Sequence, residues 1–326
     1  MATLTVYGNT SDGYITSTDG FSEYSSSLYP NARNGTGFTF TANTSGTSIT
    51  VGQSYYAPLD IYISCYLAGL SFTNTLVEGD TISAAELSMY LNWDYSSADF
   101  TVRLRAQNWG STLATADWTT SFSSTLLATR ATSGLGSGYN AFTSESAFVS
   151  NITKGGTNYW MLSSSEQEAN SEPTTLEYVD WYASDESGTT KDPKLVITYT
   201  SNTAPTITSG PTTTYASGTA TTPTVTWGVT FTATDAEQTG TDALTYYIRT
   251  SSTFGGGTQV ATGTCTSGSS KAVTGLAYNA PGVVVGSQTL YLHIYDGALN
   301  TVTAGSFTLL RIDAKPFRCA LLGVGV

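Results

Sequence analysis

The stretch Phe100-Thr-Val-Arg-Leu-Arg105 alternates between apolar and polar residues at every position. Alternation with a period of two is typical of a β-strand that buries one face and exposes the other. The same period appears in 87–91, 195–198 and 290–295, and glycine-rich turn sequences separate such stretches. Since no helical period is present, we predict an all-β fold with negligible helix and at most one helical turn, at 83–86.

The chain of 326 residues is long enough for about two domains of ordinary size. The clearest boundary is Ser201-Asn-Thr-Ala-Pro205, which follows a strand-like stretch and precedes a new segment rich in Thr and Pro. We therefore predict two tandem β-sandwich domains, at 1–200 and 206–312, with a linker at 201–205 and a C-terminal tail at 313–326.

The composition indicates a folded protein with a neutral surface rich in hydroxyl groups. Only 11% of the residues are charged, against about 25% in an ordinary domain, whereas 40% are hydrophobic. The net charge of −12 argues against a nucleic-acid partner, since phosphates require a basic surface. The N-terminus lacks the features of a signal peptide and no run of about 18 apolar residues occurs. We therefore expect synthesis in a cytoplasm and no membrane partner.

The sequence contains no catalytic constellation. The single histidine, His293, lies in a strand-like stretch opposite the apolar face, and we expect a surface-facing structural residue. Neither a G-x-S-x-G nucleophile motif nor a phosphate-binding glycine loop occurs. Glu166, Glu168 and Glu172 lie in one polar segment; two of them could serve glycoside hydrolysis, but a solvated loop is the interpretation we prefer. We therefore predict that the protein is not an enzyme.

Four carboxylates of the second predicted domain are candidate metal ligands: Asp235, Glu237, Asp242 and Asp296. Hard oxygen ligands suit calcium, and calcium is the only cofactor that the sequence suggests. Aspartates also cap turns, and we favour this second role because the full acidic ligand set of a calcium site is lacking.

Trp93 and Trp109 are candidate glycan-binding residues. Each follows an asparagine at the expected end of a strand, where a loop platform would lie. Aromatic rings stack on the apolar faces of sugars, but they also serve as core and subunit-contact residues, which is their more common role.

The C-terminal tail is a candidate assembly segment. The eight residues from Cys319 to Val326 carry no charged side chain. Burial of large apolar side chains is worth about 1.5–3 kcal/mol each, so the tail is expected to dock on a neighbouring subunit or to fold back on its own domain. The residues expected to dock are Phe317, Leu321, Leu322, Val324 and Val326.

Residues 1–200 resemble the DNRLRE-type β-sandwich modules of bacterial surface and phage proteins. The resemblance lies in Asp12-Gly-Tyr-Ile15, Asp60 to Leu70, Gly79 to Tyr90 and Asp192 to Tyr199. It implies a jelly-roll-like sandwich for the first domain.

Residues 205–312 resemble a bacterial Ig-like or cadherin-like module. The stretches Phe231 to Glu237 and Leu290 to Asn300 share its form of an alternating strand, an aspartate and a turn. The resemblance implies an Ig-like or cadherin-like sandwich, and tandem modules of both kinds occur on phage particles and on secreted adhesins.

These observations together predict a non-enzymatic virion structural protein of a bacteriophage. The expected role is capsid decoration, tail fibre or tail-associated subunit, with other virion proteins or further copies as partners and a surface glycan as a contact. The expected location is the virion surface, after synthesis in the host cytoplasm. The alternative is an extracellular protein, a secreted carbohydrate-binding or adhesin module of a bacterium.

Overall fold

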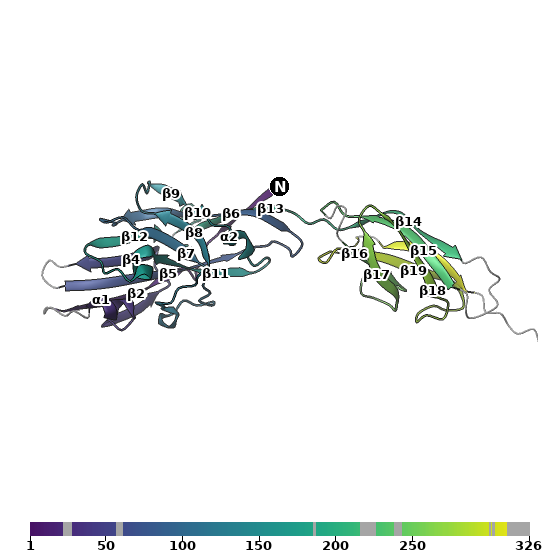
Figure 1. Cartoon of the computed structure of the whole chain (residues 1–326), viewed down its shortest axis with the longest axis horizontal. Helices are drawn as coiled ribbons and strands as arrows, with labels where there is room; N and C mark the ends of the chain where they lie inside the picture. Colours follow the sequence, from purple (N-terminus) through teal and green to yellow (C-terminus); the bar gives the residue numbers. More distant parts are fainter. Residues whose placement is uncertain are drawn as a thin grey trace, which may run out of the picture. The chain divides into compact units, whose positions relative to one another are not determined.

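The computed structural model describes residues 1–21, 28–56, 61–184, 187–215, 226–237, 243–299, 301 and 304–311. It divides into two compact units, unit 1 (Met1–Ser201) and unit 2 (Asn202–Val326), each shown in Figure 1. The chain is 54% strand and 7% helix with several antiparallel sheets, which confirms the predicted all-β sandwich class. No helix among the described residues has the length and apolar character needed to cross a membrane.

The described strands of unit 1 form one 13-stranded antiparallel sheet. The strands are β1 (Ala2–Tyr7), β2 (Gly13–Phe21), β3 (Thr39–Asn43), β4 (Ser48–Tyr56), β5 (Ile61–Thr73), β6 (Thr81–Asp94), β7 (Thr101–Arg105), β8 (Leu126–Ala131), β9 (Gly138–Ala141), β10 (Thr143–Ser144), β11 (Thr157–Ser164), β12 (Leu176–Tyr182) and β13 (Lys194–Thr200). Their order is β1-β13-β6-β12-β4-β5-β11-β7-β8-β10, with β2 beside β5 and β3, and β9 beside β6.

Strand β5 connects the two parts of this sheet. Residues 62–66 pair with β4 and residues 68–73 pair with β11, while β2 runs along 61–69. The alternation predicted for β7 is confirmed, since Val102 and Leu104 are fully buried and the polar residues between them are partly exposed. The largest side chains of the core include Phe72, Phe148, Trp160 and Trp181.

Short helical segments also occur among the described residues of unit 1: α1 (Leu28–Arg33), η1 (Thr115–Asp117), α2 (Ala147–Ser150) and α3 (Ser165–Ala169). Helix α1 lies against β2 and β5 and buries Leu28, Tyr29 and Ala32 there. The helical turn considered at 83–86 is absent, because those residues belong to β6 and their backbone pairs with β13.

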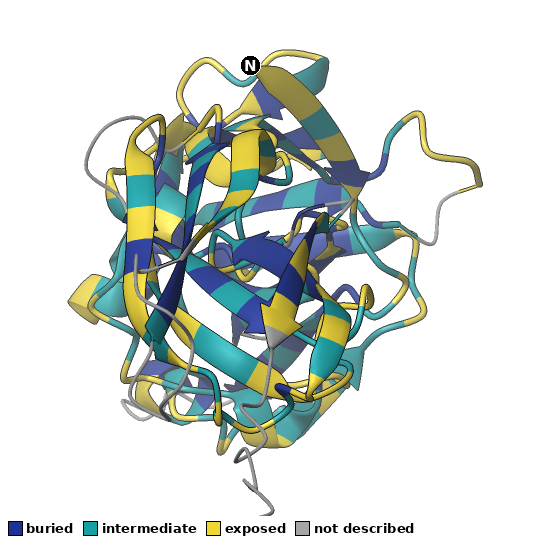
Figure 2. Cartoon of the chain, turned by 90° about the vertical axis from the view of Figure 1, so that its right-hand side faces the viewer, coloured by how far each residue is buried: buried dark blue, intermediate teal, exposed yellow. Residues whose placement is uncertain are grey.

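Unit 2 has a three-stranded and a four-stranded sheet, in the orders β14-β15-β18 and β17-β16-β19-β20. The strands are β14 (Thr206–Tyr215), β15 (Thr226–Thr234), β16 (Ala243–Arg249), β17 (Gln259–Thr266), β18 (Ser270–Ala277), β19 (Gly286–Tyr295) and β20 (Gly305–Arg311). Residues from both sheets, such as Trp227, Phe231, Ile248 and Leu292, form one core. Figure 2 shows buried and exposed residues alternating along the strands, as the period of two requires.

Candidate functional site

Five aromatic side chains of unit 1 form a continuous row, here called the aromatic row: Trp93, Tyr95, Tyr178, Tyr66 and Tyr14. In that order, successive ring centroids are 6.5, 4.7, 5.4 and 6.3 Å apart. All four separations lie in the range in which aromatic pairs attract one another. The row thus links the end of β6 to β12, β5 and β2.

The row crosses β4 because Gly52 occupies the crossing point. Tyr178 pairs in register with Gly52, and Gly52 pairs with Tyr66. Gly52 has a φ of +124°, and a Cβ atom there would lie 2.2 Å from the carbonyl oxygen of Glu177. The missing side chain therefore allows the two tyrosine rings to meet across the intervening strand.

The end of the row at β6 is both exposed and fixed in position. Trp93 is 61% exposed and Tyr95 is 36% exposed. The amide of Tyr95 donates a hydrogen bond to the carbonyl oxygen of Tyr178, and the two rings stack at an interplanar angle of 24°. Asp94 closes the following turn by accepting hydrogen bonds from the amide and hydroxyl of Ser96.

Polar groups lie beside the rings on the same face of the sheet. Asp180 on β12 pairs in register with Trp93 on one side and Thr50 on the other. The hydroxyl of Thr50 donates to Oδ1 of Asp180 over 2.6 Å. Further along this face, the hydroxyls of Thr18 and Ser64 are 2.8 Å apart. The face therefore combines aromatic surface with a carboxylate and several hydroxyls.

Burial changes the acid–base properties of these groups. It raises the pKa of Asp180, and the hydrogen bond from Thr50 offsets only part of that increase. Burial, together with the neighbouring Tyr66, Asp180 and Tyr95, raises the pKa of Tyr178 to about 12. The pKa of Tyr66 is also raised, again mainly by burial. Tyr66 and Tyr178 are therefore neutral hydrogen-bonding groups at neutral pH.

The raised pKa of Asp180 predicts a pH-dependent effect of Asp180→Asn on stability. A carboxyl whose pKa is higher in the folded state costs stability once it ionises, so the cost develops above about pH 4. The variant keeps an oxygen for Thr50 but carries no charge. We expect it to have a higher free energy of unfolding than the wild type at pH 7 and the same value at about pH 3.5.

Urea titrations at both pH values measure this difference. Glu78→Gln is the control, because it removes an exposed carboxylate and should change stability little at either pH. A lower stability of Asp180→Asn at pH 7 would contradict the prediction.

Trp109, the second tryptophan predicted to contact glycans, is only 5% exposed. Its indole N–H donates to the carbonyl oxygen of Trp160 over 3.0 Å, and it packs with Leu113 and Met161. The segment that follows β7 contains Trp109 and packs its ring onto the sheet, against Gly69 of β5. Trp109 is therefore a core residue in the structure, whereas Trp93 lies at the surface.

The acidic segment around Glu168 is not the solvated loop expected from the sequence. Residues 165–169 form α3, which Ser164 caps by accepting a hydrogen bond from the amide of Gln167. The carboxylate of Glu168 accepts hydrogen bonds from Arg103, Arg105 and Ser163 and is 10% exposed. Burial alone would raise the pKa of Glu168, but these hydrogen bonds outweigh it, and the pKa lies below its ordinary value.

The carboxylates considered for calcium are engaged in turns of unit 2. Oδ1 of Asp296 accepts from the amides of residues 298 and 299, and Oδ1 of Asp235 accepts from the amide of Glu237. Oε2 of Glu237 accepts from Thr203, and Asp242 lies outside the described residues. Within the described part of the chain, no group of three potential ligand residues comes together. Calcium binding stays an alternative to the turn-capping role that the sequence favours.

His293 is 1% exposed, which corrects the expectation of a surface-facing residue. The loop between β16 and β17 covers the His293 side chain. Nε2 of His293 lies 3.0 Å from the carbonyl oxygen of Ser251, and the ring centroids of His293 and Phe254 are 5.7 Å apart. Phe254 also contacts Tyr247 and Tyr295. The sequence pattern identified the correct strand face but not the loop that covers it.

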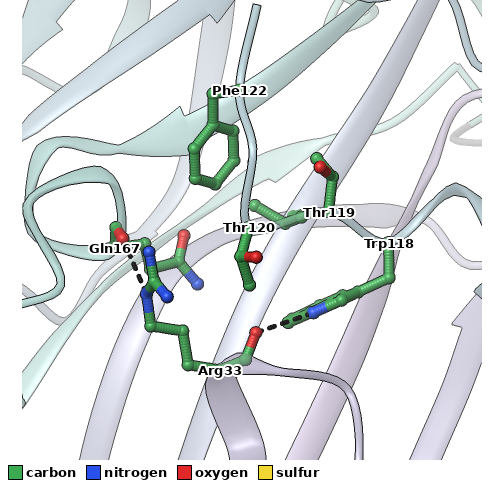
Figure 3. Close-up of a pocket in the computed structure, with 7 residues that line it drawn as sticks. Arg33, Trp118, Thr119, Thr120, Phe122 and Gln167 are labelled. Carbon is green, nitrogen blue, oxygen red and sulfur yellow. Dashed lines mark hydrogen bonds between the residues drawn. The ribbon is translucent and has the colours of Figure 1, made fainter. Parts of the chain in front are cut away.

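A small hollow lies between α1, α3 and the segment after η1 (Figure 3). Nε of Arg33 donates to the carbonyl oxygen of Gln167 over 3.1 Å, and the indole of Trp118 donates to the carbonyl oxygen of Arg33 over 2.8 Å. Thr120 and Phe122 complete the wall. The hollow has an empty volume of about 170 Å³, part of which is open to solvent, and it contains no enclosed space large enough for a water molecule.

The predicted assembly residues, Phe317, Leu321, Leu322, Val324 and Val326, lie outside the described residues. The row residues that the sequence analysis missed are Tyr14, Tyr66, Tyr95 and Tyr178. Their only local signal is a tyrosine at a polar position of an alternating stretch, which many of the 21 tyrosines share.

No protein-family model and no curated protein matches the chain. Among solved structures, it is similar to the trimeric ectodomain of the C. elegans fusion protein EFF-1, with 10% identity and a TM-score of 0.21, covering 96% of this chain and 85% of that one. The EFF-1 fusogen on extracellular vesicles gives 8% identity and a TM-score of 0.20, covering 96% and 84%. Likenesses this weak carry no argument about fold or function.

Proposed function

We propose that the chain is a non-enzymatic structural protein on the surface of a bacteriophage particle, where unit 1 contacts glycans. The proposed role is capsid decoration, tail fibre or tail-associated subunit. Its proposed partners are other virion proteins or further copies of itself.

The exposed end of the aromatic row is the observation that carries the glycan contact. Trp93 and Tyr95 present open aromatic surface, and backbone and stacking contacts fix Tyr95 in place. Contiguous exposed apolar patches on soluble proteins often mark binding sites, and aromatic residues are enriched in the cores of such sites.

The neutral, hydroxyl-rich composition and the state of the ionisable groups support a non-enzymatic role. Glu168 is bound by two arginines, and the ring of His293 contacts a backbone carbonyl under a loop. The hydroxyl of Ser163 also binds Glu168 but is fully buried, so the described contacts of Glu168 are those of a structural ion pair and differ from the two carboxylates that flank the bond in glycoside hydrolysis. The resemblance of the sequence to modules of phage surface proteins supports the location.

The virion role can be tested directly by asking whether the chain stays associated with purified phage particles, and we expect that it does. The chain should co-purify with phage particles through a density gradient and a high-salt wash, as measured by quantitative mass spectrometry. A variant ending at Ile312 should stay folded but fail to join the particle, if the tail docks on a neighbour. Full incorporation of that variant would contradict docking by the tail.

The alternative function is a secreted carbohydrate-binding or adhesin module of a bacterium, and the same aromatic row favours it. The two differ in location. Recovery of the chain in the medium of uninfected cells, with none on purified particles, would support the alternative and contradict the virion role.

A further inference from the structure

We infer that the aromatic row is a binding site for a neutral saccharide, with Trp93 as the stacking surface and Asp180 as an acceptor for saccharide hydroxyls. This inference rests on the glycan contact in the proposed function and names the residues and the ligand class. Its basis is the combination of an open ring, a fixed neighbouring ring and an adjacent carboxylate.

The apolar part of the site is preorganised. A pyranose ring presents C–H groups on its faces, so it needs a flat, accessible aromatic surface. Trp93 is 61% exposed, and Tyr95 adjoins it at an interplanar angle of 37°. Because Tyr95 already stacks on Tyr178, the Tyr95 ring loses little side-chain freedom when a ligand binds, which lowers its share of the entropic cost of binding.

The polar part of the site lies one strand away. Asp180 is the cross-strand neighbour of Trp93, a placement that brings the two Cβ atoms within about 5.5 Å. Thr50 occupies Oδ1 of Asp180, and no donor among the described residues is hydrogen-bonded to Oδ2. An ionised carboxylate only accepts hydrogen bonds, and saccharide hydroxyls can donate them. Trp93 can therefore contact the apolar C–H face of a sugar while Asp180 accepts hydrogen bonds from its hydroxyls.

The charges around the row favour a neutral saccharide over an anionic one. Asp180 pairs in register with Trp93 on the same face of the sheet, and its ionised carboxylate would repel an anionic sugar. Lys191 and Lys194 lie over the rings of Tyr182 and Tyr139, so their ammonium groups are already engaged. The described arginines of unit 1 contact other groups: Arg33 contacts Gln167, Arg103 and Arg105 contact Glu168, and Arg130 contacts Gly134 and Asn140.

The test compares binding of the full-length protein and its variants to soluble polysaccharides by affinity electrophoresis and tryptophan fluorescence. Hydroxyethyl cellulose and dextran are the neutral probes, and polygalacturonate is the anionic probe. Trp93→Ala is expected to weaken binding to a neutral probe by about tenfold, the effect of a central aromatic contact. Asp180→Asn is expected to weaken it by less.

Tyr7→Ala is the matched control, since Tyr7 on β1 is 39% exposed, close to the 36% of Tyr95, and lies outside the row. It should bind as the wild type does. Circular dichroism confirms that each variant is folded, and Tyr95→Ala provides a second variant of the exposed end.

Each other outcome overturns the inference in a distinct way. Unchanged binding by both Trp93→Ala and Tyr95→Ala would place the glycan contact elsewhere and leave the proposed function intact. Preference for polygalacturonate would contradict the neutral class. The saccharide site would be overturned if the protein bound none of the probes, or if Trp93 were instead needed to capture a virion protein. Co-purification with phage particles tests the virion role separately.

Discussion

Glu168→Gln is expected to lower the free energy of unfolding of unit 1 by about 3 kcal/mol at pH 7. The carboxylate of Glu168 accepts hydrogen bonds from Arg103 over 2.6 Å, from Nε and Nη2 of Arg105 over 2.9 and 2.5 Å, and from Ser163 over 2.6 Å. Glutamine would leave the two guanidinium groups without a counter-charge. Its side-chain NH2 group, a hydrogen-bond donor, would also face the donors of the arginines and Ser163. The side chain of Arg103 is 33% exposed, so water limits the loss to the lower end of the range for broken buried ion pairs.

The same interaction predicts a pH dependence. Since the pKa of Glu168 is lower in the folded state, its stabilisation is fully present above about pH 4.3 and is lost as the pH falls through the folded-state pKa. The difference between Glu168→Gln and the wild type should therefore shrink in acid. Glu172→Gln is the control, because Glu172 is exposed in the same segment. Equal stability of Glu168→Gln and the wild type in urea at pH 7 would refute the network's role.

Gly52→Ala is expected to destabilise unit 1 by about 3 kcal/mol and to disturb the aromatic row. The new Cβ would lie 2.2 Å from the carbonyl oxygen of Glu177 and 2.7 Å from the Cα of Tyr178. Both atoms belong to the backbone, so relief requires β4 to move away from β12. A φ of +124° is also unfavourable for any residue with a side chain.

Urea titration measures the loss of stability, and near-ultraviolet circular dichroism reports the packing of the tyrosines. Gly136→Ala is the control: Gly136 lies in an exposed loop, and a Cβ there would meet no atom within 4 Å. It should leave both measurements unchanged. A Gly52→Ala protein with native stability and an unchanged tyrosine spectrum would show that β4 tolerates a side chain at the crossing point.

The fold class could be predicted from the sequence because it depends on local alternation. In 100–105 and 290–295 the apolar positions identified the buried face correctly, since side chains of a strand point to opposite faces in turn. His293 shows the limit of that reasoning. Alternation placed it opposite the core, but a loop from another part of unit 2 covers that face.

Trp93 and Trp109 show the same limit for the candidate site. Each follows an asparagine, and nothing local distinguishes them, yet one is 61% exposed and the other 5%. The difference arises because the ring of Trp109 packs onto residues of distant strands, such as Met161, whereas most of the Trp93 side chain is exposed. Likewise Glu168 shares a polar segment with Glu166 and Glu172, and only tertiary structure brings Arg103 and Arg105 to it.

Composition and the period of two thus determined an all-β chain that is rich in hydroxyl groups and poor in charged residues, because those properties depend on each residue and its near neighbours. The aromatic row was decided by tertiary structure alone. Tyr14, Tyr66, Tyr95 and Tyr178 lie far apart along the chain, and the register of β2, β5, β4 and β12 brings them together. Register depends on pairing between distant strands and on one glycine at the crossing point, which no local pattern specifies.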